Sequence, residues 1–559
     1  MFTFKKINNI TGWSVFGIAA LTYMLTVEPT ASFWDCGEFI AASYKLQVPH
    51  PPGAPFFLLI NRLFSMLSFG DVTKVAYWVN VSSALASAFT SLFLFWTITL
   101  LGRRVLKITS DVVSVPQTIL LMGAGTVGAL AYTFCDSAWW SAVEAEVYAM
   151  SSFFTAFVVW AMFKWELIED EAASNRWLIF IAYTIGLTIG VHLLNLVTLP
   201  ALALIYYFKK YKITPLGIGA ALLAGFVLIF VVQNAIIPGL PSFAQSLEIL
   251  FVNDLGLPFY SGIIFFLLVF FGALVFGLIY TQRKQLVLAN TGLLALSFIL
   301  IGYASYTQVL IRSNFNTPIN ENNPSDNIKF VSYLKREQYG DRPLLYGPNF
   351  TSQLLDQKQG EGLYRKDNKT GKYEIYDYRI ENIFDPNKVE DPEQREQIKR
   401  VLRERGNPKN GLTLFPRLFS KADNHPQIYR QRLNFGAKEN PSFGHNVKWF
   451  FERQLGYMYF RYFLWNFGGR ESDIEGATYL RPWEVSTKGL PHELQNNKGR
   501  NQYFWLPLFL VILGLIFLFG KDRQAFAIVG LLYIFTGIAL VVFLNSPPVE
   551  PRERDYIYV

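Results

Sequence analysis

The sequence predicts a polytopic α-helical membrane protein with about eleven transmembrane helices and one extracytoplasmic soluble domain of mixed α/β structure. Three observations support this class: 52% hydrophobic residues against 16% charged, a mean hydropathy of +0.25 over 559 residues, and repeated apolar runs of nearly twenty residues. This apolar content excludes a disordered chain, and two cysteines exclude a disulfide scaffold. We interpret the net charge of +8 as topology signals rather than as a nucleic-acid surface.

The apolar runs locate the expected spans, each long enough for a hydrocarbon core of about 30 Å. They cover residues 10–27, 76–102, 117–134, 142–163, 177–191, 193–208, 215–236, 260–281, 287–311, 503–520 and 524–544. The first run follows Lys5 and Lys6 but has no small-residue cleavage site, so we expect it to be retained. The two short runs that meet at Gly190-Val191-His192 are read as two spans or as one broken helix.

The composition divides the chain into four parts. Residues 1–312 form the main transmembrane domain, with a first outer loop at 28–75, and residues 313–502 are polar enough for a soluble domain. Residues 503–545 supply two further helices, and 546–559 form an outer tail. Within the polar part we expect a hairpin from Tyr364 to Tyr378 with its turn near 368–371, and an exposed helix over 391–405. In the first loop, residues 56–69 favour a helix lying along the membrane surface.

The short loops show a consistent asymmetry of basic residues. With the N-terminus inside, every second loop carries Lys or Arg, as at Arg103-Arg104, Lys209-Lys210 and Arg283-Lys284. The opposite short loops, near 135–141, 190–194 and 237–259, contain neither residue. The positive-inside rule then predicts a cytoplasmic N-terminus and an extracytoplasmic soluble domain. It also places the unusual ionisable residues at the outer membrane ends, where such costly groups tend to mark a site.

The first outer loop carries the strongest candidate catalytic pair, Asp35 and Glu38, in the segment Ser32-Phe33-Trp34-Asp35-Cys36-Gly37-Glu38. On a helix the spacing i, i+3 puts both carboxylates on one face, where one can serve as a base beside the other. A structural alternative is a capping box from Ser32 to Asp35 that only starts the helix.

Two cationic side chains are candidates for phosphate binding. His50 lies in Pro49-His50-Pro51-Pro52-Gly53-Ala54-Pro55, a stiff turn that fixes it relative to the Asp35 helix, and it could bind phosphate or orient a carboxylate. Arg312 ends the ninth span on the outer side, against the charge rule, and could contact phosphate. The alternatives are a structural corner for His50 and snorkelling to lipid headgroups for Arg312.

Two further segments place polar side chains at the outer membrane ends. Glu144 and Glu146 precede Tyr148, and on a helix the two acids would point to different sides. His192 and Asn195 share one face of an apolar turn. We take Glu146, Tyr148, His192 and Asn195 as candidate substrate contacts, with helix-start acids and ordinary packing residues as the alternatives.

Other chemistry has little support. Cys36 and Cys135 each adjoin an acid on the outer side, where a disulfide or two packed free thiols are both compatible with the sequence. Five histidines and two cysteines show no metal-ligand spacing, and there is no P-loop, dinucleotide fingerprint or nucleophile elbow. We therefore expect no metal and no cofactor, and an ATP-driven pump is disfavoured.

The segments Phe33-Trp34-Asp35-Cys36-Gly37-Glu38-Phe39 and His50-Pro51-Pro52-Gly53-Ala54-Pro55 resemble the family named domain of unknown function 2723, in its Bacteroidetes form. Residues 145–149, 312–324 and 333–340 are similar to the same family, so the resemblance covers most of the chain. That family is related to protein O-mannosyltransferases of the transmembrane protein 260 type. The resemblance implies a GT-C glycosyltransferase fold whose first outer loop carries the catalytic acid. Related sequences continue beyond a segment like 551–556, so a fragment or a short form would explain where this chain stops.

The resemblance also implies a reaction. A sugar, mannose or a similar hexose, would move from a polyprenyl-phosphate donor to a Ser or Thr hydroxyl of a secreted or periplasmic protein, with inversion, on the outer face of the inner membrane. Asp35 would be the base, Glu38 and Glu146 would orient it or the sugar, and His50 or Arg312 would meet the phosphate. A transporter or flippase for a lipid-linked or small polar solute is the main alternative, because membrane carboxylates suit it equally well. A non-catalytic scaffold is a third.

Overall fold

The membrane part of the protein is a bundle of long apolar helices. The computed structural model describes residues 3–340, 342–436, 439–550 and 552–558. Within these ranges eight helical segments are long and apolar enough to cross a membrane: Val72–Val105, Val115–Thr133, Val147–Glu166, Leu193–Lys210, Pro215–Asp254, Ser261–Arg283, Val287–Ser313 and Arg523–Leu544. The polytopic class is therefore confirmed. Three further expected spans coincide with helices α1 (Phe4–Thr26), α8 (Glu171–Ile189) and α21 (Leu506–Lys521), so the count of eleven stays a prediction.

Close packing in the bundle depends on small residues. Helix α4 (Val75–Val105) packs against α1, α5 (Val115–Thr133) and α7 (Val147–Glu166), and it buries a row of Ser and Ala side chains that includes Ala84, Ser87 and Ala88. Small side chains let helix backbones approach closely in lipid. The same holds where α8 crosses α13 (Val287–Tyr303), since a Cβ atom on Gly186 would overlap the backbone of Ile299.

Helix α7 begins later than the sequence predicts. The expected span over 142–163 is divided into a short α6 (Asp136–Ala142), a break over residues 143–146, and α7, which starts at Val147. Glu144 and Glu146 therefore lie in the break and not along a helix, so the expectation that they point to different sides of one helix is wrong. The break lets both carboxylates turn toward the first outer loop.

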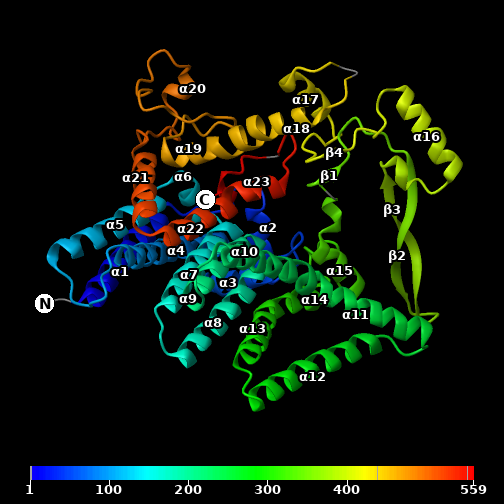
Figure 1. The fold of residues 1–559 in the computed structure, drawn as a ribbon, viewed down its shortest axis with the longest axis horizontal. Helices are drawn as coiled ribbons and strands as arrows, with labels where there is room; N and C mark the ends of the chain where they lie inside the picture. The colour runs from blue at the N-terminus through cyan, green and yellow to red at the C-terminus, as the bar shows by residue number, and fades with distance from the viewer. Residues whose placement is uncertain (1–2, 341, 437–438, 551, 559) are drawn as a thin grey trace.

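The segment 215–254 forms one continuous helical run, which corrects the expected loop over 237–259. It comprises α10 (Pro215–Phe230), the π-helical η3 (Val231–Gly239), α11 (Leu240–Ile249) and the π-helical η4 (Leu250–Asp254). Pro238 lies inside η3, and a π-helical stretch accommodates such an interruption without ending the helix. Helix α12 (Ser261–Arg283) then packs back along α11 (Figure 1).

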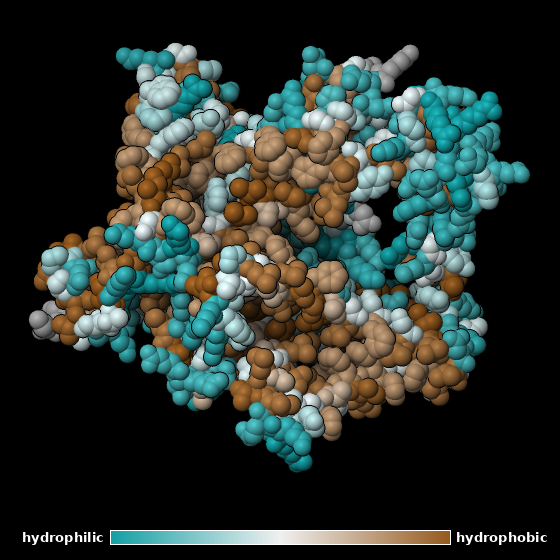
Figure 2. Space-filling view, in the orientation of Figure 1, coloured by the Kyte–Doolittle hydropathy of each residue, from teal (hydrophilic) through white to brown (hydrophobic). Residues whose placement is uncertain are grey.

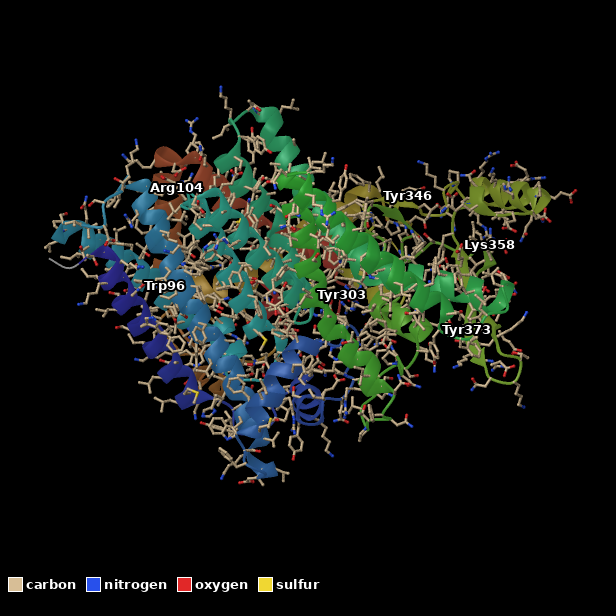
Figure 3. The ribbon with its side chains drawn as sticks, turned by 90° about the horizontal axis from the view of Figure 1, so that it is seen from below. Trp96, Arg104, Tyr303, Tyr346, Lys358 and Tyr373 are labelled. Atoms are coloured by element: carbon tan, nitrogen blue, oxygen red, sulfur yellow. The ribbon has the colours of Figure 1, made fainter. Side chains whose placement is uncertain are left out.

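The basic loops meet at one end of the bundle. Arg104, labelled in Figure 3, donates from Nη1 to Glu166 at 2.6 Å and from Nε to Asp522 at 2.6 Å. Lys209 donates to the carbonyls of Trp165 and Ile168. These contacts join the ends of α4, α7 and α9 (Leu199–Lys210) to the start of α22 (Arg523–Tyr533). The gathering of these basic residues at one end of the bundle agrees with the predicted sidedness. Which end is cytoplasmic stays a prediction.

The polar region after α14 (Thr307–Ser313) mixes helices with two small sheets. The long hairpin of β2 (Asp356–Asp367) and β3 (Lys372–Ile383) pairs Tyr364 with Ile375, as expected, and the expected exposed helix is α16 (Pro392–Glu404). A second antiparallel pair joins β1 (Tyr346–Gly347) to β4 (Thr413–Leu414). The remaining helices are α15 (Asn327–Lys335), α17 (His425–Leu433), α18 (Phe443–Trp449), the π-helical η8 (Phe450–Phe460), α19 (Arg461–Phe467) and α20 (His492–Gln495).

The hairpin is attached to the end of the long helix 215–254. The Asn253 side chain accepts from the Tyr373 N–H at 2.8 Å and donates to its carbonyl at 2.7 Å, while the Tyr373 hydroxyl donates to Glu248. Figure 3 shows Tyr373 on the same side of the molecule as Lys358 of β2. In Figure 2, polar side chains cover the hairpin, α16 and α20, whereas apolar side chains cover α12 and α13.

The last helices return the chain to the bundle. Helix α22 continues through the π-helical η9 (Ile534–Ile538) into α23 (Ala539–Leu544). The Asn545 side chain then donates to the carbonyls of Pro343 and Pro416, which holds the polar region on this end. The final turn, η10 (Asp555–Tyr558), packs against α6 (Figure 1).

Candidate active site

The first outer loop presents Asp35 at the start of a short helix. Helix α2 (Cys36–Lys45) begins directly after Asp35, which occupies the N-cap position but makes no capping hydrogen bond. The capping-box alternative, with Asp35 inside the first turn, is therefore wrong. Because its carboxylate is 45% exposed and is not used by its own helix, it is available to a substrate or to another side chain.

Glu38, one turn further along α2, binds His50. Its carboxylate accepts from the His50 backbone N–H at 2.8 Å and pairs with Nδ1 at 2.6 Å. Burial opposes ionisation of both groups, but each offsets this for the other, so the pKa of Glu38 is lowered and that of His50 is raised. Each side chain thus favours the charged form of the other, and the contact matches the proposal that His50 orients a carboxylate.

The proline-rich turn that carries His50 is anchored on two sides. The Tyr333 hydroxyl of α15 donates to the Pro49 carbonyl at 2.6 Å, and the Gly190 carbonyl accepts from Phe56 at the start of α3 (Pro55–Met66). Gly53 has φ +89°, and a Cβ atom there would overlap the Tyr333 hydroxyl. Only glycine fits this close approach.

Glu146 faces the same space from the start of α7. It is the N-cap of that helix, and its side chain is 4% exposed. Burial raises the pKa of Glu146 to about 8, even though the charge of Arg552 favours the carboxylate. Burial also raises the pKa of Glu144. Below pH 8 the site therefore holds Glu146 mainly as a neutral acid, which can donate a hydrogen bond.

Arg552 joins Asp35 to Glu146. Its Nη2 atom lies 3.0 Å from Oδ2 of Asp35 and 3.5 Å from Oε1 of Glu146, and the Trp34 and Tyr556 rings pack on the guanidinium. Sequence reasoning missed Arg552 as a site residue. A usable signal was present, because a charge-dense segment that follows the last span must emerge at the same membrane end as the first outer loop.

Tyr148 and His192 continue the site. The Tyr148 ring lies 5.3 Å from the His192 ring and 4.5 Å from the Tyr556 ring. Burial lowers the pKa of His192 to about 4, so it is neutral, and its Nδ1 accepts from the Leu194 N–H. Asn195 lies deeper, where its Oδ1 accepts from Ser151 and Thr155 while its amide nitrogen has no partner.

Arg312 lies at the other end of α2. Its Nε and Nη2 atoms donate to the carbonyls of Leu46 and Lys45, which follow Asp35 by three turns or about 15 Å at 1.5 Å per residue. The structure therefore uses Arg312 to hold the C-terminus of α2, and it does not bring this residue together with Asp35, Glu146 and Arg552. The contact of Arg312 with phosphate stays a prediction. The cation beside Asp35 in this structure is Arg552.

Cys36 and Cys135 are both buried and free, so the disulfide alternative does not occur in this structure. Cys36 packs beneath the first turn of α2, where its Sγ lies 4.0 Å from Asn80 Oδ1. The packed-thiol alternative is the one observed.

Asp35, Glu38 and His50 have ligand atoms within 4.8 Å of one another, which is close enough to hold a metal ion. Sequence spacing gave no sign of this cluster. In the structure, however, Glu38 and His50 pair with each other and Asp35 pairs with Arg552. The ligand atoms are therefore already satisfied, and the expectation that no metal is needed stays a proposal.

Together these residues place one exposed carboxylate, one buried guanidinium and one buried neutral acid within hydrogen-bonding reach. A carboxylate beside a cation can take a proton from an incoming hydroxyl while the cation stabilises a departing anion. The chemistry that fits is transfer of a group from an anionic leaving group to an alcohol.

Comparison with known families gives two matches. A model of the Protein O-mannosyl-transferase TMEM260 N-terminal domain matches residues 35–214, and a family of unknown function, DUF8416, matches residues 340–451. The first match begins at Asp35 and contains Glu38, His50, Glu146, Tyr148, His192 and Asn195. The second covers most of the polar region that holds the hairpin.

Two curated proteins are similar to the chain. The mouse protein, Protein O-mannosyl-transferase TMEM260 of Mus musculus, is 28% identical over 164 residues, which is 29% of this chain and 20% of that protein. Protein O-mannosyl-transferase tmem260 of Dictyostelium discoideum is 24% identical over 139 residues, or 25% of this chain and 15% of that protein. The matched part thus spans a fifth or less of each relative. No solved structure matches the chain significantly.

Proposed function

We propose that this chain is a membrane glycosyltransferase that moves a hexose such as mannose from a polyprenyl-phosphate carrier to a Ser or Thr hydroxyl. The acceptor is a secreted or periplasmic protein, and the reaction takes place on the outer face of the inner membrane. The observation that carries the proposal is the contact of Asp35 with Arg552, at the first residue of the segment similar to the O-mannosyltransferase domain.

The proposed reaction assigns a role to each group. The acceptor hydroxyl oxygen attacks the anomeric carbon, and its proton passes to the Asp35 carboxylate. The bond from the anomeric carbon to the phosphate oxygen breaks with inversion, and the electron pair leaves with the polyprenyl phosphate. The ion pair of Glu38 with His50 fixes α2 and hence Asp35, while neutral Glu146 and the Tyr148 ring face the sugar.

The sharpest test is sugar transfer from a polyprenyl-phosphate mannose to a Ser/Thr peptide by the purified protein. Removing a general base costs about 10²–10⁴-fold in rate, so Asp35→Asn is expected to lose at least about 100-fold. The matched control is Asp71→Asn, which replaces an acid of the same loop that caps the turn Val72–Lys74 and pairs with Lys74.

Equal transfer by Asp35→Asn and the wild type would remove the assignment of Asp35 as base. Absence of transfer by the wild type, together with robust uptake of a polar solute into proteoliposomes, would instead support the transporter alternative.

A further inference from the structure

Arg552 lies in a site that is otherwise rich in acid. Its side chain is 14% exposed and contacts Asp35 and Glu146, with Glu144 nearby. Two other basic side chains lie near this cluster, and each already has an acidic partner: His50 is engaged by Glu38 and Arg554 by Glu550. A phosphate that entered here would meet carboxylates unless a guanidinium turned toward it. Arg552 is placed to do so, and guanidinium binds phosphate in a bidentate geometry.

The residues that follow Arg552 are held in place by hydrogen bonds. Glu553 accepts from Arg461 Nη2 at 2.6 Å, from the Tyr462 hydroxyl and from the Gly476 N–H. Asp555 accepts from Ser137 of α6 at 2.5 Å. The backbone that follows Arg552 is therefore anchored to α19 and α6, while the guanidinium contacts Asp35, Glu146 and the Trp34 and Tyr556 side chains.

One residue away from Arg552, across the Tyr556 ring, a cavity of about 280 Å³ lies between α4, α7 and η9. Tyr148, Tyr556 and Ile557 line it, and the Tyr556 ring also packs on the Arg552 guanidinium. Its wall continues past Ala156 to Val159 of α7, about 16 Å from Tyr148 at 1.5 Å per residue. The lining is mixed, with hydroxyls such as Thr90 and Ser152 among apolar side chains.

We propose that Arg552 and this cavity together form the binding site of the lipid donor, with Arg552 moving from Asp35 to the phosphate and the first isoprene units entering the cavity. This rests on the proposed function, because it assigns the donor of that reaction. Tyr556 both lines the cavity and packs on the guanidinium, so a polyprenyl phosphate is placed to occupy both at once. A free phosphate ion would use Arg552 alone.

One consequence follows for the order of events. While Arg552 pairs with Asp35, the guanidinium occupies Oδ2 of the carboxylate, at 3.0 Å, where an acceptor hydroxyl would otherwise bind. A donor phosphate that takes over Arg552 releases Asp35 to accept a proton. Donor binding therefore activates the base, and Asp35 competes with the phosphate for one guanidinium.

The test measures binding of farnesyl phosphate, farnesol and inorganic phosphate to the purified full chain, without any sugar. The wild type is expected to bind farnesyl phosphate about tenfold more tightly than farnesol, the factor that one charge-assisted hydrogen bond supplies. It is also expected to bind farnesyl phosphate at least about tenfold more tightly than inorganic phosphate, which lacks the apolar chain that the cavity would bury. Arg552→Gln is expected to lose the preference for farnesyl phosphate over farnesol. Ala156→Phe fills the cavity and is expected to weaken both prenyl probes about tenfold. Arg400→Gln, on the exposed face of α16, is the control.

The variant Asp35→Asn distinguishes this proposal from a purely structural role of Arg552. That variant removes the competing carboxylate, so it is expected to bind farnesyl phosphate about tenfold more tightly than the wild type, with no such gain in the double variant Asp35→Asn/Arg552→Gln. Unchanged preference for farnesyl phosphate in Arg552→Gln, or no gain in Asp35→Asn, would overturn the inference even if sugar transfer is observed. The predicted binding pattern in a wild type that transfers no sugar would leave the site intact and remove the proposed function.

Discussion

The guanidinium of Arg552 lies 3.0 Å from the carboxylate of Asp35, although 517 positions separate the two residues in the chain. One comes from the first outer loop and the other from the segment after the last helix. The contact lies at the end of the helical bundle opposite to Arg104.

The ion pair of Glu38 with His50 is expected to stabilise the fold in a defined pH range. Because the pKa of Glu38 is lowered from 4.5, Glu38 stabilises the folded state at pH values above 4.5. This stabilisation is lost as the pH falls through the pKa that Glu38 has in the folded state. Because the pKa of His50 is raised from 6.5, His50 stabilises the folded state at pH values below 6.5. This stabilisation is lost as the pH rises through the pKa that His50 has in the folded state. Glu38→Gln is therefore expected to cost about 1 kcal/mol between pH 4.5 and 6.5 and less at pH 9. Thermal unfolding at several pH values measures this, and a cost that is equal at pH 6 and pH 9 would contradict the pair.

Glu146 has the opposite effect on stability. Its pKa of about 8 lies above the usual 4.5, so between these values the folded chain holds a proton that the unfolded chain has released. Stability contributed by neutral Glu146 is complete below pH 4.5 and is lost as pH rises toward 8. Glu146→Gln cannot ionise, so its melting temperature is expected to exceed that of the wild type by a few degrees at pH 9 and to match it at pH 5. The exposed Glu169→Gln serves as control, and parallel pH profiles for Glu146→Gln and the wild type would argue against a buried neutral acid.

The hydrogen bonds from Arg461 to Glu553, which anchor the C-terminal segment, are expected to contribute to stability and to donor binding. Arg461 is 5% exposed and donates two hydrogen bonds to Glu553, so Glu553→Ala leaves a buried guanidinium without its partner. Such a loss costs about 3 kcal/mol and also frees the backbone next to Arg552. We expect a lower melting temperature and weaker binding of farnesyl phosphate than in the exposed control Glu475→Gln. A stable variant with unchanged binding would show that the anchor does not position Arg552.

Transfer activity is expected to resist chelation. Glu38 is engaged with His50 at 2.6 Å and Asp35 with Arg552 at 3.0 Å, so the three possible ligands already have partners. Treatment of the wild type with EDTA should leave the rate within about twofold, well below the loss that follows removal of a general base. Loss of activity that Mg²⁺ or Mn²⁺ restores would instead assign the cluster of Asp35, Glu38 and His50 to a metal ion.

The sidedness of the bundle can be measured with single cysteines. Val72 lies in the first loop and is 66% exposed, while Val112 lies beside the basic turn after α4 and is 52% exposed. The positive-inside rule predicts that an impermeant maleimide labels Val72→Cys in intact cells and Val112→Cys only after permeabilisation. The buried Cys36 and Cys135 provide the background. The reverse pattern would place Asp35 in the cytosol and end the proposed function.

Much of the site was predictable because its residues are close in sequence or belong to polar segments at membrane ends. Asp35, Glu38 and His50 meet because one short helix and one rigid turn connect them. The break that carries Glu146 was not predictable, since apolar residues continue on both sides of it and hydropathy has no signal for a helix that stops and restarts. The contacts of Arg312 were not predictable for a related reason. A charge at a membrane end can bind a ligand or a carbonyl, and only the position of the Lys45 and Leu46 carbonyls shows which.

The sequence by itself determined the membrane class, the alternation of basic and acidic ends, the hairpin and the acid of the first loop, because hydropathy, loop charge and turn chemistry are local properties. Only the tertiary structure decided that Arg552 meets Asp35, that Glu146 is buried beside them, and that a cavity opens at Tyr148 and Tyr556. The physical reason is that a contact across 517 positions depends on how the helices pack. That packing is the sum of many small side-chain fits, such as Gly186 against Ile299, which no single segment of the sequence specifies.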